Sequence, residues 1–351
     1  MALTVELNPN ETRLREAELR ARTGKLRMRD VANELDVPEA ALLEARLATG
    51  EATRLKRQDG EAGFGKIIEH VVAVGEVMAL TRNAHCVHEQ HGRYSQPKFY
   101  GAMGQVVGEV DLRIFTQHWC FGYAMREPLE SGTRHSLQFF DEFGDAVHKI
   151  YVTQATDFGA FETLVADHTE PHPSPPTYTT KSSPKPESAD ESIDLDGFRL
   201  GWAKLEHSHA FYGLLNEYGV GRHQAMRLGG PDFVRQIDPK HVRKAFETCA
   251  FEKTPVMIFV SNAGCVQIHS GSIDNIKIMG PWFNILDPHF NLHLREDRIS
   301  FAYVVRKPSV RGDVHAIELY DEDGFCFLQM FGERKPGETE REDWRSTVLS
   351  L

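Results

Sequence analysis

The sequence predicts an α+β fold made of a tandem repeat, in which each half is a large antiparallel β-sheet flanked by helices. Three observations indicate it: the length and composition of the chain, an internal repeat, and the same order of helices and strands in both halves. The 351 residues suffice for about two domains. Hydrophobic residues make up 41% and charged residues 26%, so each half can bury a core.

The internal repeat joins two stretches that lie far apart in the chain. MALTRNAHCVHEQHGRY at 78–94 aligns with MIFVSNAGCVQIHSGSI at 257–273. At an offset of 179, five identities coincide: Asn83, Ala84, Cys86, Val87 and Gly92 match Asn262, Ala263, Cys265, Val266 and Gly271. HSLQFFDEFG at 135–144 aligns with HAIELYDEDG at 315–324, at an offset of 180. Unrelated domains would rarely keep one offset over so long a span, so we predict a duplicated unit.

Helices precede strands in each half. Helical patterns cover 11–49 and 66–74 in the first half and 200–254 in the second. Runs rich in Val, Ile, Phe and Tyr then predict strands at 77–80, 106–115 and 135–151, and at 256–260, 290–294, 299–305 and 315–330. Asp-Glu-Phe-Gly and Asp-Glu-Asp-Gly predict hairpin turns, because glycine reaches the positive φ that such turns need.

The segment between the halves, 168–196, is rich in Pro, Ser, Thr and acidic residues. It offers little to bury, so we expect an exposed linker. The expected organisation is an N-terminal repeat at 1–167, this linker, and a C-terminal repeat at 197–351.

The composition narrows the classes of function. Forty Lys and Arg against 51 Asp and Glu give a formal net charge of −11, which argues against nucleic acid as the primary ligand. The sequence has no run of about 18 apolar residues, so we expect no membrane span. Residues 1–20 lack the apolar core of a secretory signal. Five cysteines without a CxxC pair are typical of reduced thiols, so we expect a cytoplasmic protein.

Histidines are the main candidates for chemistry, since the sequence contains no glycine-rich phosphate loop, GxSxG elbow or HExxH motif. His85, His88 and His91 are spaced by three. In a strand this spacing alternates between the two faces, which favours a structural or surface role over a metal site.

A second candidate lies in GWAKLEHSHAFYGLLNEYG at 201–219, which we interpret as one helix that ends at Gly219. One stripe of such a helix carries Trp202, Leu205, His209, Tyr212 and Asn216. His209 would then lie on a mostly apolar face, either as a satisfied core histidine or as an axial ligand presented to a flat hydrophobic cofactor. His207 points to nearly the opposite side and is the weaker candidate.

A looser alignment of the two halves, at an offset of 183, bears on this candidate. It sets His209 against Leu26 and Arg222 against Glu39. The first half would then have no ligand and an acid in place of a base, so a metal-bearing anionic ligand would belong to the second half.

Several long motifs, in the same order, bring the chain close to a known family. These are MALTRNAHCVHEQHGRY at 78–94, DLRIF at 111–115, RHSLQFFDEFGDAVHKIYV at 134–152, IFVSNAGCVQIHSG at 258–271, PWFNILDPHFNLHLREDRI at 281–299, RKP at 306–308, and the set Trp202, His209 and Phe211. Over nearly its whole length the chain resembles the cytoplasmic heme-degrading and heme-trafficking proteins of bacterial heme-uptake operons, the hemin-degrading factor family.

The resemblance implies a single heme (iron protoporphyrin IX) held between the two halves. It assigns the axial, metal-binding position to His209. It assigns a heme-facing position with a catalytic role to Arg113, with Phe115 beside it, and an aromatic gate to Tyr212.

The resemblance also assigns the contacts to the heme propionates, which fall on Arg222, Lys307 and Arg334. Two features depart from the family pattern. Where the family has a tyrosine before the Gly-x-Arg segment, this chain has Phe331, so a hydroxyl contact is missing. The His-Ser-His arrangement is less usual and offers His207 as a second ligand after local rearrangement.

The implied function is a heme-binding protein of iron acquisition that degrades heme to release iron. A carrier that delivers heme from a membrane importer to a separate heme oxygenase is the alternative, and anaerobic radical opening of the ring is a third. The same residues serve each role. No flavin, nicotinamide or iron–sulfur motif is present in the sequence, so electrons would come from a partner or a small reductant. Expected partners are heme, an importer ATPase, a heme oxygenase or an electron donor, with the protein a monomer or dimer.

Overall fold

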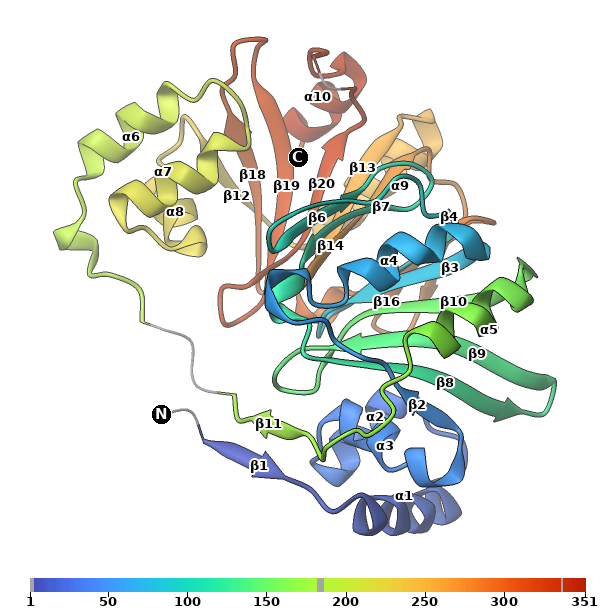
Figure 1. Cartoon of the computed structure of the whole chain (residues 1–351). Helices are drawn as coiled ribbons and strands as arrows, with labels where there is room; N and C mark the ends of the chain where they lie inside the picture. The colour runs from blue at the N-terminus through green and yellow to red at the C-terminus, as the bar shows by residue number, and fades with distance from the viewer. Residues whose placement is uncertain (1–2, 182–185, 336) are drawn as a thin grey trace. The chain divides into compact units, whose positions relative to one another are not determined.

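The computed structural model describes residues 3–181, 186–335 and 337–351, which fold into two compact units (Figure 1). Unit 1 contains Met1–Arg82, Glu89–Ser183 and Asn262–Gln267. Unit 2 contains Asn83–His88, Pro184–Ser261 and Ile268–Leu351. Each unit therefore includes a short segment that comes from the opposite half of the chain.

Unit 1 is built from helices at both ends of its sequence and strands between them. Its elements are β1 (Thr4–Glu6), α1 (Pro9–Thr23), α2 (Met28–Leu35), α3 (Glu39–Glu44), β2 (Ala52–Arg54), α4 (Gly65–Val71), β3 (Gly75–Arg82), β5 (Lys98–Tyr100), β6 (Met103–Val106), β7 (Asp111–Phe115), β8 (Phe121–Leu129), β9 (Gly132–Phe140), β10 (Ala146–Thr156), α5 (Phe158–Asp167) and β11 (Thr177–Thr179).

Unit 2 repeats this order. Its elements are α6 (Leu195–Ala203), α7 (Ala210–Tyr218), α8 (Arg222–Leu228), β12 (Val234–Ile237), α9 (Lys240–Glu252), β13 (Val256–Ser261), β15 (Ile276–Met279), β16 (Trp282–Leu286), β17 (Phe290–Arg295), β18 (Phe301–Lys307), β19 (Val314–Tyr320), β20 (Cys326–Gly332) and α10 (Glu342–Leu349). Strands β4 (Cys86–Arg93) and β14 (Cys265–Gly271) contain part of the short segments that come from the opposite half.

The central sheet of each unit is antiparallel throughout. In unit 1 its strands run in the order β3-β10-β9-β8-β2, and in unit 2 in the order β13-β20-β19-β18-β12. A smaller antiparallel group accompanies each, β5-β6-β7 in unit 1 and β15-β16-β17 in unit 2. The predicted fold class, a tandem α+β repeat with large antiparallel sheets, is confirmed.

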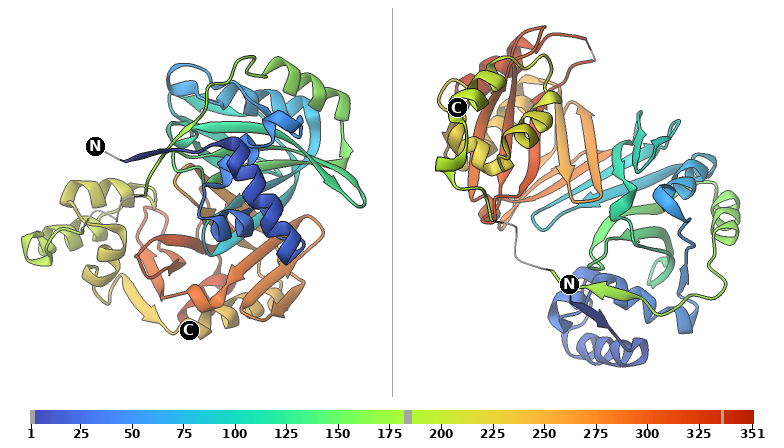
Figure 2. Two further views of the ribbon diagram at one scale, coloured as in Figure 1. Left: turned by 90° about the horizontal axis from the view of Figure 1, so that it is seen from below. Right: turned by 60° about the vertical axis from the view of Figure 1, so that its left-hand side comes forward.

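Both faces of the central sheet in unit 2 carry helices. Buried residues of α9 and α10, such as Phe246 and Trp344, join one core with Ile258 and Leu319 of the sheet. The other core combines α6, α7 and α8 with the opposite sheet face. Figures 1 and 2 show these three helices gathered beside β12 and β18. In unit 1, α4 and α5 cover one face, while α3 packs on the other.

The looser alignment at an offset of 183 agrees with the local structure. Helices α2 and α7 both end in a left-handed residue, Asp36 with φ 52° and Gly219 with φ 64°. Glu39 is then the first residue of α3, as Arg222 is of α8. The predicted hairpin turns are also present, with Gly144 at φ 77° and Gly324 at φ 78°.

Three predictions of local structure need correction. The expected single helix at 201–219 is two helices, since α6 ends at Ala203 and α7 begins at Ala210. The expected strand at 106–115 is the hairpin of β6 and β7.

The expected linker contains β11, which pairs with β1, and the aromatic side chain of Tyr178 in it is buried, with 2% of its surface exposed. Residues 182–185 of that segment lie outside the described residues.

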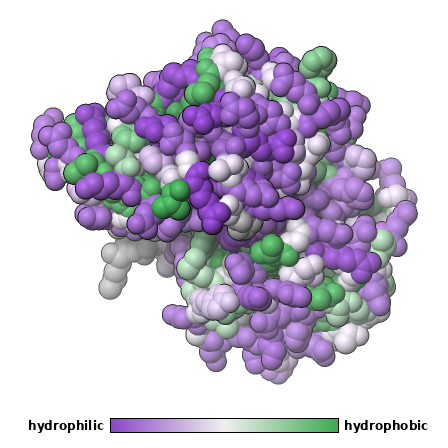
Figure 3. Space-filling view, turned by 90° about the horizontal axis from the view of Figure 1, so that it is seen from above, coloured by the Kyte–Doolittle hydropathy of each residue, from purple (hydrophilic) through white to green (hydrophobic). Residues whose placement is uncertain are grey.

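The face shown in Figure 3 is mostly hydrophilic, with scattered apolar side chains. This surface agrees with the composition and net charge of the chain. No helix among the described residues is long and apolar enough to cross a membrane.

Candidate functional site

The break between α6 and α7 places His209 at a helix N-terminus. His209 is the N-cap of α7, its side chain is exposed, and its ring centroid lies 6.3 Å from that of His207. His207 accepts a hydrogen bond at Nδ1 from the backbone N–H of Ala210, at 3.1 Å. The neutral His207 ring therefore carries its proton on Nε2, so it can ligate a metal only after losing this bond or changing tautomer.

The buried face of α7 differs from the predicted stripe. Phe211, Leu214 and Leu215 face the core, whereas Tyr212 is 71% exposed. The stripe fails because residues 204–209 do not continue the helix. His209 is therefore not a core histidine.

Two predicted site residues adjoin the start of α7. Arg334 follows β20, and its Nη2 lies 3.5 Å from Oγ of Ser208, next to His209. Lys307 ends β18, and its Nζ lies 4.7 Å from the ring centroid of Phe211. The fold thus brings two cations to the segment that carries His209.

Lys307 also belongs to a buried cluster around Glu318, which the sequence analysis did not single out. The Glu318 carboxylate has no exposed surface. Its Oε1 accepts bonds from Lys307 Nζ at 2.6 Å, Arg222 Nη2 at 3.0 Å and Gln329 Nε2 at 3.0 Å. Its Oε2 accepts from Arg222 Nε at 3.2 Å and from the Tyr320 hydroxyl at 2.7 Å.

These contacts fix the charges of the cluster. Burial alone would raise the pKa of Glu318, but Arg222 and Lys307 hold that pKa well below its usual range. Burial lowers the pKa of Lys307, and the Glu318 carboxylate offsets this only in part. Burial would also lower the pKa of Arg222, yet Glu318 raises it above its ordinary value. The cluster contains two cations and one anion.

An apolar strip lies on the same sheet face as Glu318. Strand register places Gln329 opposite both Glu318 and Phe259, and Phe331 opposite Met257. The Phe259 and Phe331 rings lie 5.1 Å apart, and both side chains are only half-buried. This face therefore offers an aromatic surface beside cations, which suits a flat apolar ligand that bears carboxylates.

Arg113 and Phe115 lie on β7, in unit 1. The guanidinium of Arg113 pairs with Asp111, and its side chain is 40% exposed. The Phe115 backbone N–H donates to the carbonyl oxygen of Gly264, at 2.9 Å, and its side chain is half-buried. His209, Tyr212, Arg222, Lys307 and Arg334 all belong to unit 2.

The histidines spaced by three have separate surroundings. In unit 2, His85 Nε2 lies 3.2 Å from a carboxylate oxygen of Asp321, and His88 packs against Phe290. His91 belongs to unit 1. Within the described part of the chain, no three His, Cys, Asp or Glu side chains are grouped to bind a metal ion.

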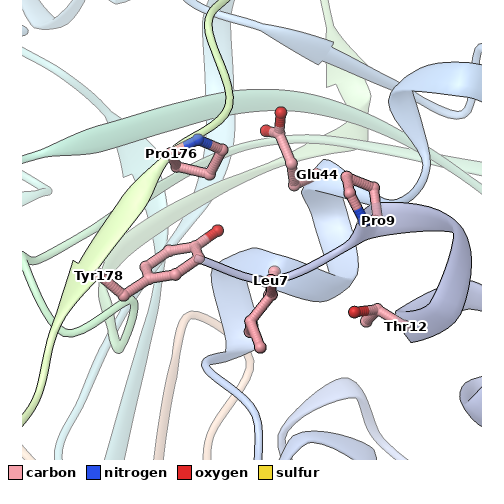
Figure 4. Close-up of a pocket in the computed structure, with 7 residues that line it drawn as sticks. Leu7, Pro9, Thr12, Glu44, Pro176 and Tyr178 are labelled. Atoms are coloured by element: carbon pink, nitrogen blue, oxygen red, sulfur yellow. The ribbon is translucent and has the colours of Figure 1, made fainter. Parts of the chain in front are cut away.

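Unit 1 has a small crevice that contains none of the predicted site residues (Figure 4). Its volume of about 170 Å³ is below that of pockets for drug-sized ligands. Leu7, Pro9, Thr12, Ala41, Glu44, Pro176 and Tyr178 line it. It is too small for a porphyrin.

Comparison with known proteins agrees with the fold. The haemin-degrading HemS.ChuX domain family matches residues 36–168 and 219–351, and the chain belongs to this family. The hemin transport protein HemS of Yersinia enterocolitica is 35% identical over 328 residues, which cover 92% of each chain. HmuS of Yersinia pestis, another hemin transport protein, is 34% identical with the same coverage.

Solved structures extend this likeness to nearly the whole fold. PhuS, a heme-binding protein from Pseudomonas aeruginosa, superposes in its heme-bound form with a TM-score of 0.93 and 39% identity, covering 98% of this chain and 99% of that one. ChuS, an Escherichia coli heme oxygenase, gives a TM-score of 0.86 and 31% identity, covering 97% and 99%.

Proposed function

We propose that this protein binds one heme as its substrate in bacterial heme uptake and opens the porphyrin ring to release iron. The observation that carries the proposal is the grouping, in unit 2, of an exposed histidine, His209, with three cations, Arg334, Lys307 and Arg222. Membership of the haemin-degrading family and likeness to heme-binding PhuS support it.

The residues present fit heme chemically. Heme iron takes a neutral imidazole as axial ligand, which we assign to His209. The half-buried rings of Phe259 and Phe331 suit the apolar plane, whose burial contributes about 25 cal/mol per Å² removed from water. We assign the two propionates to the cations Arg222, Lys307 and Arg334, because a partly buried carboxylate is costly without such partners.

Arg113 is assigned a catalytic role on the opposite side of the heme, with Phe115 beside it and Tyr212 as an aromatic gate. These assignments, and a heme held between the repeats, rest on the family resemblance. Arg113 can donate hydrogen bonds where negative charge develops during ring opening. Electrons would come from a partner protein or a small reductant.

Two steps test the function. Hemin titration should give a Soret band with a single binding site. The complex is then reduced under air in the presence of catalase, and the products are identified by mass spectrometry. An open tetrapyrrole with released iron is expected. Unchanged heme, or breakdown only when free peroxide is present, would contradict the enzymatic step.

A carrier function is the second candidate. It is favoured by the two Yersinia relatives, which are described as hemin transport proteins. In this case an importer ATPase would supply heme and a separate heme oxygenase would receive it. We also propose a cytosolic location, which the five unpaired cysteines support. We retain two repeats at 1–167 and 197–351 as the organisation of the chain.

A further inference from the structure

Glu318 lies between two of the cations that we assign to the heme propionates. It has no exposed surface, and its two oxygens accept five hydrogen bonds from nitrogen and oxygen donors. Two come from Arg222 and one each from Lys307, Tyr320 and Gln329, so both carboxylate oxygens are engaged within this cluster. Arg222 itself is not fully buried, since 35% of its side chain is exposed. The cation can therefore face Glu318 and a ligand carboxylate at the same time.

The charge count of the cluster matters for a ligand that brings two carboxylates. Arg222 and Lys307 supply two positive charges, and the negative charge of Glu318 balances one of them. A heme propionate that approaches these cations must share them with an anion already in place. Like charges at close range in a buried site repel, so Glu318 opposes the ligand while it keeps the cations ordered.

Unit 1 contains a counterpart of the Glu318 cluster, built from residues that we do not assign to heme. Glu39 begins α3, where Arg222 begins α8, and it pairs with Arg82 and with Lys149 Nζ, at 2.5 Å for the lysine. The helix therefore starts with an acid in unit 1 and with a base in unit 2. On the central strands, Gln138 pairs with Lys149 in unit 1, and Glu318 pairs with Gln329 in unit 2.

Both units thus bury one acid against two cations, although the acid lies on a helix in unit 1 and on a strand in unit 2. The exchange leaves an arginine with 35% of its side chain exposed at the helix start of unit 2 and a carboxylate, 4% exposed, at that of unit 1. The Glu39 cluster pairs its charges with one another, and its cations Arg82 and Lys149 are only 13% and 8% exposed. The Glu318 cluster also leaves a cation accessible to a ligand.

We propose that Glu318 is an internal counter-anion that sets how tightly this site holds the carboxylates of heme. It keeps Arg222 and Lys307 charged and in place before heme binds, and it competes with the propionates once heme is bound. The inference rests on the proposed heme-binding function. It makes Glu318 a positioning residue that favours the release of heme, a property useful both to a carrier and to an enzyme that must take up new substrate.

The test compares wild type with Glu318→Gln, using hemin and hemin dimethyl ester, which lacks free carboxylates. For hemin, we expect the dissociation constant to fall about tenfold and transfer to excess apomyoglobin to slow by a similar factor, as for removal of a repelling charge at a buried pair. For the diester, binding should change little. Glu39→Gln is the matched control, since it removes the equivalent acid of unit 1 and should leave hemin binding unchanged.

A second variant keeps the test decisive if Glu318→Gln does not fold. Lys307→Met should weaken hemin binding, and the double variant Lys307→Met/Glu318→Gln, which restores the net charge of the cluster, should bind hemin more tightly than Lys307→Met alone. Equal or weaker binding in the double variant overturns the inference. So does equal or weaker hemin binding by Glu318→Gln, or an equal gain for the diester. Absence of a Soret band in wild type would instead overturn the proposed function itself.

Discussion

Arg222 and Glu39 begin equivalent helices of the two repeats and carry opposite charges. Arg222 is bound by the buried Glu318 on strand β19, whereas Glu39 is bound by Arg82 on β3 and Lys149 on β10. The duplicated fold therefore keeps the position of an ion pair while it reverses the charges. Arg222 in unit 2 is also the most exposed of these cations, at 35% of its side chain against 13% for Arg82 and 8% for Lys149.

Replacing that cation tests its role toward the propionates. Arg222→Gln is expected to weaken hemin binding about tenfold, because a charge-assisted hydrogen bond to a carboxylate is lost. Binding of hemin dimethyl ester should change much less, since the ester has no anion to pair. Titrations of the variant with hemin and with the diester, followed by absorbance, measure the two affinities. An equal loss for the two ligands would show that Arg222 does not recognise the carboxylates.

His209→Ala is expected to weaken heme binding or change the ligation of the iron, because its imidazole is exposed at the start of α7. His207→Ala should have the smaller effect, since His207 is engaged in capping that helix. Absorption spectra and hemin affinities of the two variants show which histidine ligates the iron. If His209→Ala matches wild type and His207→Ala is the damaging change, the ligand assignment is wrong.

Arg113→Ala separates binding from chemistry. Because Arg113 is assigned to the reacting side of the heme and not to its propionates, hemin affinity should change less than about threefold, while the rate of ring opening falls by about tenfold to a hundredfold. Arg93→Ala, at an exposed arginine of unit 1, serves as the control. A loss of hemin affinity as large as the loss of rate would contradict a catalytic role for Arg113.

Asn262 is expected to be important for stability. Its Nδ2 donates to the carbonyl oxygens of Arg82 and Val147, at 2.9 and 2.8 Å, and its Oδ1 accepts from the backbone of Gly264 and Cys265. Asn262→Ala leaves these groups unsatisfied, so the free energy of unfolding should fall by about 2–4 kcal/mol. Urea unfolding measures this. A loss no larger than that of the exposed Asn10→Ala would refute the prediction.

His148 should make the stability depend on pH. Its ring is fully buried between the Tyr94 hydroxyl, 2.5 Å from Nε2, and Thr81 Oγ1, 2.8 Å from Nδ1. Burial lowers the pKa of His148 to about 3. The unfolded chain therefore binds a proton that the folded protein does not, from about pH 6.5 down to about pH 3, and stability is lost as the pH falls through this range.

The variant His148→Leu, which copies Leu328 at the equivalent position of the second repeat, removes this dependence. The stability difference between pH 7 and pH 5 should be smaller than in wild type by about 2 kcal/mol. Urea unfolding at both values provides the measurement. The same pH dependence in the two proteins would show that His148 is not the group responsible.

The repeat was the most informative feature of the sequence. Matching asparagines, cysteines and Asp-Glu-x-Gly turns predicted paired hairpins, and the structure confirms the antiparallel α+β repeat. The helix at 201–219 was predicted wrongly, because its central residues include good helix formers. At the start of α7 the His207 ring accepts a hydrogen bond from the backbone N–H of Ala210, a local contact that the helical periodicity did not predict.

The duplication and the order of helices and strands could be predicted from the amino-acid sequence, which also supplied the candidate residues His209, Arg113, Arg222, Lys307 and Arg334. These follow from periodicity, repeated motifs and family resemblance. The folded protein was needed to see that Arg222 and Lys307 meet at Glu318, and that Phe259 and Phe331 share its sheet face. Strand register and helix packing join residues that are distant in the chain, and local sequence does not specify which partners they acquire.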